Sequence, residues 1–280
     1  MAVGIVTDSS CDLPDALVAE HGIEVVPLVI RFGSEELVDR QDLTPAQFWA
    51  RSASSPTLPE TAAPPPGAFE EAFRRVGARC DGGVVCVTLS SKLSATIQSA
   101  EAAAKSVVDE VDVRVVDSRS VTMGLGMIVL EAARAGAVDG ATPDGVAQVA
   151  ERGAARTRVY GTLDTLENLK KGGRIGAAQA LLGSLLSIKP IIEVRDGVVE
   201  PGPRQRTRAR ALAWLADQVR TNPPVGDVAV VHGEAPDAEE LVKLLRRDLP
   251  PERIFLADLG AVIGTHAGPR TVGIAFQVAG

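Results

Sequence analysis

The chain has 280 residues, of which 45% are hydrophobic, so it can form one large or two ordinary globular domains and is not intrinsically disordered. Its net charge of −7 argues against a nucleic-acid-binding protein as a whole. Only 3% of the residues are aromatic, so we expect an interior of Ala, Val, Leu and Ile.

Cysteine usage and the chain start indicate a cytoplasmic protein. Cys11, Cys80 and Cys86 are odd in number and lack zinc-type spacing, which indicates reduced thiols and no metal or other cofactor. The first residues lack the basic segment of a signal peptide. The most apolar long run, residues 175–192, contains Lys189 and falls short of a transmembrane span, so no stable membrane insertion is expected.

Apolar runs and helix-forming runs alternate through the first half of the chain. The pattern predicts strands at residues 3–7, 23–30, 84–89 and 111–116, and helices at 13–21, 44–49, 68–79, 95–104, 121–135 and 142–152. This alternation is typical of an α/β fold with a parallel sheet. Residues 54–67 are rich in Pro and Ser and are predicted to form a long irregular loop.

Three of the predicted strands run into turns rich in acidic and hydroxyl side chains. These strands end near Thr7, Leu89 and Val116. Because ligands of parallel sheets bind beyond the carboxyl ends of the strands, the three turns predict a binding site. The middle turn also leads into a helix, whose free N–H groups and dipole suit an anion. The alternative is that Ser91 or Ser94 only caps this helix.

The second half of the chain has a different pattern. Asp196 and Gly197 lie between two apolar runs and indicate a β-hairpin, so a mixed sheet is expected. We therefore predict two domains, an α/β parallel-sheet domain at 1–153 and a smaller mixed-sheet α/β domain at 154–280. Further strands are predicted at 228–231, 254–257 and 271–278, helices at 177–186, 211–219 and 238–247, and a loop at 264–269.

Common catalytic and nucleotide-binding motifs are missing from the sequence. It has no GxxxxGK[ST] phosphate loop and no GxSxG elbow, and its three histidines lack metal-type spacing. Alone, His266 would be an exposed loop histidine and Thr61 a turn residue. The basic groups that include Arg174 and Arg204 form either a solvated face or a docking patch for an acidic partner or a phosphate.

Several blocks of the sequence nevertheless resemble the DegV family. They are TDSSCDLP at 7–14, LSSKLSATIQSA at 89–100, VDSRSVTMGLG at 116–126, and the stretches 169–194 and 265–273. They follow one another in the family's order and cover nearly the whole chain.

The resemblance implies two α/β domains that bury a long-chain fatty acid of the palmitate or oleate class. It implies that Thr61 and Ser94 hold the carboxylate, with His266 nearby. It further implies a non-enzymatic carrier subunit of bacterial fatty acid kinase, whose separate ATP-binding subunit phosphorylates the bound acid. On the carrier hypothesis, the basic patch near Arg174 and Arg204 is a candidate docking face for the kinase subunit. The apolar stretch 177–192 either forms part of the tunnel wall or is plain core packing.

The chain departs from the family pattern around both hydroxyls. Ala62 and Ala63 stand where a Ser and a Gln are usual after the first hydroxyl, and Ala95 replaces the usual Gly. The direct hydroxyls are kept, whereas possible supporting hydrogen bonds are lost.

A second hypothesis is an esterase or acyltransferase in which Ser94 is the nucleophile and His266 the base. It requires these side chains within hydrogen-bond reach and an orienting acid. Because the sequence has no elbow motif, the carrier hypothesis is preferred.

Overall fold

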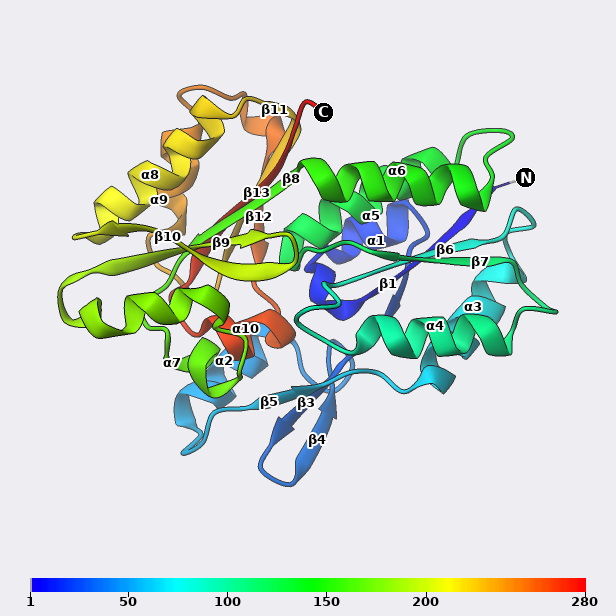
Figure 1. The fold of residues 1–280 in the computed structure, drawn as a ribbon, viewed down its shortest axis with the longest axis horizontal. Coiled ribbons are helices and arrows are strands. Elements are labelled where there is room, and N and C mark those ends of the chain that lie inside the picture. Colours follow the sequence, from blue (N-terminus) through cyan, green and yellow to red (C-terminus); the bar gives the residue numbers. More distant parts are fainter. Residues whose placement is uncertain (1) are drawn as a thin grey trace.

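The computed structural model of the chain describes residues 2–280, without the side chains of residues 183–187. Within this part of the chain the strands form three sheets, and the two larger ones lie side by side (Figure 1). Helices cover both large sheets, and the smallest sheet lies below the junction between them. No helix of the described residues is long and apolar enough to cross a lipid bilayer.

The first large sheet is parallel, in the order β2-β1-β6-β7. Its strands are β1 (Gly4–Asp8), β2 (Glu24–Val26), β6 (Val84–Thr88) and β7 (Val113–Asp117). The helices of this half are α1 (Asp15–Glu20), α3 (Pro66–Gly77), α4 (Thr96–Ser106), α5 (Thr122–Gly136) and α6 (Pro143–Arg156).

Alternation along the central strands explains why helices cover both faces. Val84 and Cys86 of β6 pack with the aromatic residues of α3, whereas Val85 and Val87 pack with α5 and α6. All four side chains are buried, as in parallel strands with two covered faces. The predicted parallel α/β arrangement of the first half is confirmed.

The second large sheet is mixed, as predicted. Its order is β10-β9-β8-β13-β11-β12, and only the pair β11 and β12 is parallel. The strands are β8 (Thr157–Thr162), β9 (Lys189–Arg195), β10 (Val198–Gln205), β11 (Pro224–His232), β12 (Ile254–Asp258) and β13 (Val272–Val278). The predicted hairpin joins β9 and β10 through Asp196 and Gly197, which both have positive φ. The helices α8 (Arg208–Thr221) and α9 (Ala238–Leu245) pack on this sheet.

The third sheet is small and antiparallel, and it corrects two predictions. It consists of β3 (Val29–Phe32), β4 (Glu35–Val38) and β5 (Glu60–Ala62). The predicted strand 23–30 is in fact β2 and β3, which belong to different sheets and are separated at Pro27. Residues 54–67 are not wholly irregular, because β3 supplies a pairing partner for β5. The helix α2 (Pro45–Ser54) connects β4 to this segment.

Two further segments differ from the predictions. The expected loop 264–269 is mostly helical, because α10 (Ala261–Ala267) extends to Gly268, whose φ of +81° ends the helix. The expected helix 177–186 is a 3₁₀ helix, η2 (Gly176–Ser187), which follows the short helix α7 (Glu167–Lys171). Two short 3₁₀ turns, η1 (Ser9–Cys11) and η3 (Pro251–Arg253), complete the described elements.

The two halves share one apolar core. The largest cluster of buried side chains runs from Ile5 and Val129 in the first half to Val231 and Ala275 in the second. The helix α5 packs against strands of both large sheets. We retain the division after residue 153 as a proposal; it falls in the last turn of α6, just before the change of sheet between α6 and β8.

A buried carboxylate also joins the halves. The Thr122 hydroxyl donates a hydrogen bond to Asp12 Oδ2 (2.6 Å), and the Gly260 N–H donates one to Oδ1 (3.0 Å). Burial raises the pKa of Asp12 to about 7, so the folded protein holds a proton that the unfolded chain has released above pH 4. The stability that this carboxyl contributes is therefore complete below about pH 4 and is lost as the pH rises to about 7.

We expect Asp12→Asn to remove this pH dependence: its amide oxygen accepts from the Gly260 N–H as Asp12 Oδ1 does, and its amide N–H donates to the Thr122 hydroxyl, which reverses the direction of that hydrogen bond. Between pH 4 and 7 the free energy of unfolding of the variant should change less steeply than that of the wild type, by up to about 1.4 kcal/mol per pH unit. Urea denaturation at several pH values measures both slopes. Asp109→Asn, at an exposed carboxyl after α4, is the matched control and should keep the wild-type slope. Equal slopes for Asp12→Asn and the wild type would contradict this account.

Candidate functional site

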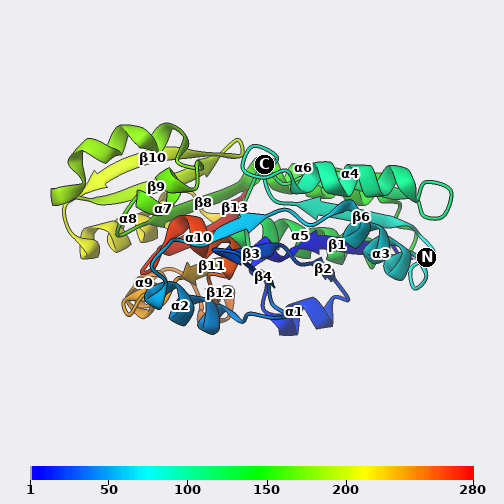
Figure 2. The same ribbon diagram turned by 90° about the horizontal axis from the view of Figure 1, so that it is seen from below.

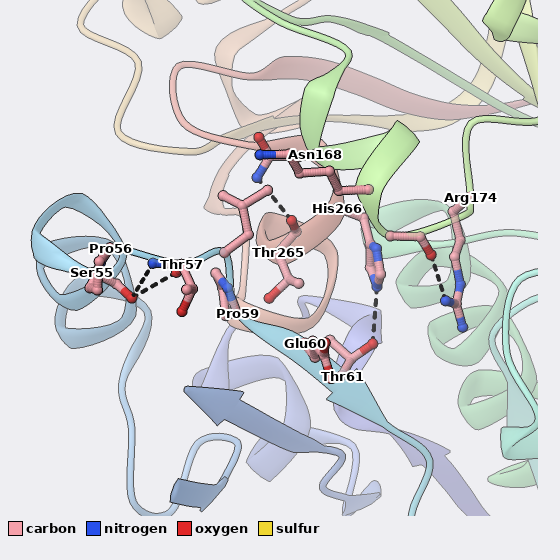
Figure 3. A pocket seen from close by; sticks show the side chains of 13 residues that line it. Ser55, Pro56, Thr57, Pro59, Glu60, Thr61, Asn168, Arg174, Thr265 and His266 are labelled. Atoms are coloured by element: carbon pink, nitrogen blue, oxygen red, sulfur yellow. Dashed lines mark hydrogen bonds between the residues drawn. The ribbon is translucent and has the colours of Figure 1, made fainter. Parts of the chain in front are cut away.

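The strand β5 and the helix α10 bring Thr61 and His266 together. The Thr61 Oγ1 and His266 Nε2 atoms lie 3.0 Å apart, although 205 residues separate them in the chain. Thr61 is fixed by strand pairing, because it lies opposite Ile30 of β3. Figure 3 shows the two side chains pointing toward each other across the mouth of a cavity. Two of the three predicted ligand-contacting residues therefore form a hydrogen-bonded pair.

His266 is neutral at physiological pH in this structure. Burial, together with the positive charge of Arg174, lowers its pKa to about 4. The ring is held tightly, because a Cβ at Gly172 would overlap its Nδ1 atom. Within the described residues Nδ1 has no hydrogen-bond partner. If Nε2 carries the proton and donates to Thr61, the threonine hydroxyl is free to donate into the cavity.

Ser94 lies in the turn between β6 and α4, beside the pair. Its hydroxyl oxygen accepts a hydrogen bond from the Thr96 N–H (3.3 Å) and lies 2.9 Å from the Thr96 hydroxyl. The N-cap of α4 is Ala95, which makes no side-chain capping hydrogen bond, so the prediction that Ser91 or Ser94 caps this helix is wrong. Ser94 lies one residue earlier and lines a cavity with Thr61 and His266. Its hydroxyl still accepts from the first N–H of α4, so it helps to fix the start of the helix from outside it.

Two carboxylates fix the turn that carries Ser94. Asp8 at the end of β1 accepts a hydrogen bond from the Leu89 N–H (2.8 Å), and burial raises its pKa to about 6. Asp117 at the end of β7 accepts from the Ser91 N–H (3.2 Å) and hydroxyl (2.5 Å). The acidic residues after β1 and β7 therefore organise the turn after β6, which explains why all three strand ends are polar.

Two cavities of opposite character meet at the Thr61–His266 pair. One has a volume of about 80 Å³ and lies among apolar side chains from both halves of the chain. They include Leu28, Leu89, Leu93, Ile192, Val199 and Val262. The other has a volume of about 590 Å³ and lies between residues 55–61 and the segment around α7 (Figure 3). Thr61, Arg174 and His266 line both cavities.

The structure separates the two arginines that the sequence grouped together. Arg174 lines both cavities and donates hydrogen bonds to the carbonyl oxygens of Leu93 (3.0 Å) and Gly172 (2.6 Å). It therefore lies within the site and not on a separate outer face. Arg204 is exposed on β10, and its guanidinium is 3.4 Å from the Ala180 carbonyl oxygen.

The predicted tunnel wall contributes only in part. Ile192 lines the apolar cavity, whereas Ala178 and Leu181 pack with Leu163 and Leu166 in a separate core cluster. Residues 183–187 of the predicted wall have side chains outside the described residues.

Sequence reasoning named Arg174 only as a docking residue and not as part of the ligand site, and it missed Gly172. The only signal was the Gly172-Gly173 pair within the basic run, which indicates a tight turn next to Arg174.

The arrangement does not support the esterase hypothesis. His266 Nε2 pairs with Thr61, not with Ser94, and no carboxylate within the described chain orients Nδ1. What the site offers is hydroxyl donors and a guanidinium at the end of an apolar cavity, which suits an amphiphile with an anionic head group. Residues 2–280, in their described part, hold no group of three metal-ligating side chains.

The proximity of Arg174 to the imidazole can be measured. We expect His266 to titrate near pH 4 and its pKa to rise in Arg174→Gln, because a positive charge is removed while burial is kept. Histidine ring signals in NMR spectra recorded from pH 3 to 8 report this directly. Arg152→Gln, at an exposed position on α6, should leave the His266 pKa unchanged. An unchanged pKa in Arg174→Gln would mean that the guanidinium does not lie beside the ring.

Comparisons with known proteins agree with this architecture. The family model described as "Uncharacterised protein, DegV family" matches residues 2–279. A DegV domain-containing protein of Streptomyces coelicolor is 38% identical over 278 residues, which are 97% of this chain and 97% of that protein. Protein DegV of Bacillus subtilis is 31% identical over 280 residues, which are 99% of each.

Solved structures are similar over the whole chain. A DegV family protein from Thermus thermophilus, described as fatty acid binding, has a TM-score of 0.90 and 33% identity, and the match covers 99% of this chain and 100% of that one. DegV from Bacillus subtilis, described as a fatty acid binding protein, has a TM-score of 0.86 and 30% identity over 100% of both chains. The fold and the sequence lead to the same conclusion: this chain belongs to the DegV family.

Proposed function

We propose that the chain binds a long-chain fatty acid, with its tail in the apolar cavity and its carboxylate at Thr61, Ser94 and His266. The observation that carries this proposal is the junction of an apolar cavity with hydroxyl donors and Arg174. The fatty-acid-binding descriptions of the Thermus and Bacillus relatives support it.

The head group and the tail of the acid both contribute to binding. A carboxylate accepts about four hydrogen bonds, and the two hydroxyls and the guanidinium offer donors for them. Burial of about 14 methylenes contributes about 11 kcal/mol, against an association cost of roughly 4 to 15 kcal/mol. The apolar cavity of about 80 Å³ is smaller than the roughly 300 to 1,000 Å³ of ligand pockets, so its leucine and valine side chains must move to admit the tail.

We further propose that the chain is the carrier subunit of a fatty acid kinase in a bacterial cytoplasm. In that reaction a carboxylate oxygen of the bound acid attacks the terminal phosphorus of ATP on the partner subunit. The bond from that phosphorus to its bridging oxygen breaks, and ADP leaves with the electron pair. This role is supported by the polar cavity, which reaches the Thr61–His266 pair that also lines the apolar cavity.

The hydroxyls should carry much of the head-group affinity. Thr61→Val and Ser94→Ala each remove a donor to a carboxylate, so we expect palmitate to bind about 10- to 100-fold more weakly. Isothermal titration calorimetry with delipidated protein measures this. The control is Thr221→Val, at an exposed hydroxyl at the end of α8 outside both cavities, which should bind within about twofold of the wild type. Wild-type affinity in both site variants would place the carboxylate elsewhere.

Docking of the kinase subunit is better tested at Arg204 than at Arg174, because a change at Arg174 would also alter the ligand site. Arg204→Glu reverses an exposed charge outside both cavities, so we expect it to slow acyl phosphate formation by the partner kinase several-fold and to leave palmitate affinity unchanged. Arg152→Glu, on α6, is the charge-matched control and should retain the full rate. Equal rates for both variants would exclude Arg204 from the docking face.

A further inference from the structure

The apolar cavity has a second neighbour besides the polar cavity at Thr61. This neighbour, which we name the distal cavity, has a volume of about 290 Å³ and lies where the turn after β7 and the end of α6 meet β8 and the end of β9. It shares only Val194 with the apolar cavity and no residue with the polar cavity. The apolar cavity is therefore flanked by two polar spaces, one at Thr61 and His266 and the other at Val194.

The boundary between the apolar and distal cavities is thin. Val121 lines the apolar cavity, whereas the preceding residue, Ser120, lines the distal one. Val194 lines both and is only partly buried against the core that the two halves share. An acyl chain that starts at Thr61 and passes through the apolar cavity therefore reaches Val121 and Val194 next to the distal cavity.

The charge of the distal cavity favours an anion. Three arginines line it, Arg119 from the first half and Arg158 and Arg195 from the second, against the two carboxylates of Glu193 and Asp196. Among the described residues the Arg119 guanidinium has no hydrogen-bond or ion-pair partner. Arg195 lies 3.8 Å from Glu193, which is longer than a hydrogen bond. Arg119 and Arg195 thus keep donors for a ligand.

Two of these arginines also lie opposite each other in the sheet. Val159 of β8 pairs with Val194 of β9, so the next position of this antiparallel ladder places Arg158 opposite Arg195. Like charges at directly opposed positions destabilise a sheet. The Arg158 guanidinium donates only to backbone carbonyl oxygens, both at 3.2 Å, so no carboxylate of the described chain neutralises it. A bound anion would reduce the repulsion between these side chains.

A hydroxyl adds a further donor at the wall of the distal cavity. Ser120 is 4% exposed, and its Oγ atom has no hydrogen-bond partner among the described residues. Leaving a buried hydroxyl without a partner costs about 1 to 3 kcal/mol. Arginine pairs with carboxylates through two parallel hydrogen bonds, and a hydroxyl can add another. The lining therefore suits a carboxylate.

We propose that the distal cavity binds a second carboxylate at the far end of the acyl chain, so that the protein accepts long-chain α,ω-dicarboxylic acids. One carboxylate lies at Thr61, the methylenes fill the apolar cavity and displace Val194, and the other carboxylate lies between Arg119 and Arg195. This inference rests on the proposed fatty-acid binding. It adds a ligand class that a closed apolar tunnel would reject.

A comparison of diacids with palmitate tests the proposal on the intact, delipidated protein. Palmitate and hexadecanedioic, octadecanedioic and eicosanedioic acids are titrated calorimetrically into the wild type. We expect the best of the diacids to bind within about tenfold of palmitate, because arginines pair with its second carboxylate. A second carboxylate left without a partner in the apolar cavity would instead weaken binding by more than about 100-fold.

Variants of Arg119 show where the second carboxylate lies. Arg119→Gln should weaken the best diacid about tenfold and change palmitate affinity less than twofold, because palmitate has no charged group at that end. Arg119→Lys keeps the charge and should recover part of the diacid affinity. Arg152→Gln, at an exposed arginine of α6 that does not line the distal cavity, is the charge-matched control and should bind both ligands as the wild type does.

The outcomes separate the distal site from fatty-acid binding itself. If the wild type binds palmitate but binds every diacid more than about 100-fold more weakly, the distal site is wrong and fatty-acid binding stands. If Arg119→Gln binds the diacid as the wild type does, or weakens palmitate equally, Arg119 does not recognise the second carboxylate, and the distal site is again wrong. If the wild type does not bind palmitate, the proposed function falls, and this inference falls with it.

Discussion

The position of the site depends on one buried carboxylate, that of Asp12. It accepts hydrogen bonds from the Thr122 hydroxyl at the start of α5 and from the Gly260 N–H at the start of α10. Because α10 carries His266, a residue of the first half fixes where the histidine of the second half lies. The contact constrains the backbone, since Asp12 and Thr122 both have φ near +50°. A Cβ at residue 260 would lie 2.5 Å from Asp12 Oδ1, which explains the glycine there.

The two halves of the chain contribute different functional groups to the candidate site. The first half provides the hydroxyls, with Thr61 on β5 and Ser94 on the turn held by Asp8 and Asp117. The second half provides the imidazole and the guanidinium, on α10 and after α7. Figure 2, seen from below, shows the light-blue strand β5 beside α10 near the junction of the two large sheets, in agreement with the contact between these elements. The carboxyl ends of the parallel strands thus face the second half, which closes the ligand position against them.

The sequence could predict those parts of the fold that depend on residues close together in the chain. The buried run of β6, the polar turns after three parallel strands and the Asp196-Gly197 hairpin all depend on neighbouring residues, and all are confirmed. β5 was missed because three residues in a Pro-rich stretch become a strand only when β3 pairs with them. α10 was missed because Gly264, Gly268 and Pro269 suggest a loop, whereas packing of Gly264 against Trp49 favours the helix.

The same distinction between local and long-range determinants applies to the candidate site. No local pattern places Thr61 beside a histidine 205 residues later, and only the family resemblance suggested that the two belong together. The resemblance did not reveal that Gly172 packs against the imidazole, or that Arg174 lies between two cavities. Both facts depend on how the end of α7 meets α10, which neither helix determines alone.

The central claim is that the carboxylate of a fatty acid lies where the two cavities meet. A crystal structure of the protein with palmitate tests it most directly. We expect both carboxylate oxygens within hydrogen-bond distance of Thr61, Ser94 or His266, with the tail between Leu89 and Val199 and the apolar side chains displaced around it. Palmitate bound with its carboxylate away from these residues, or its tail in the polar cavity beside Lys171, would contradict the account.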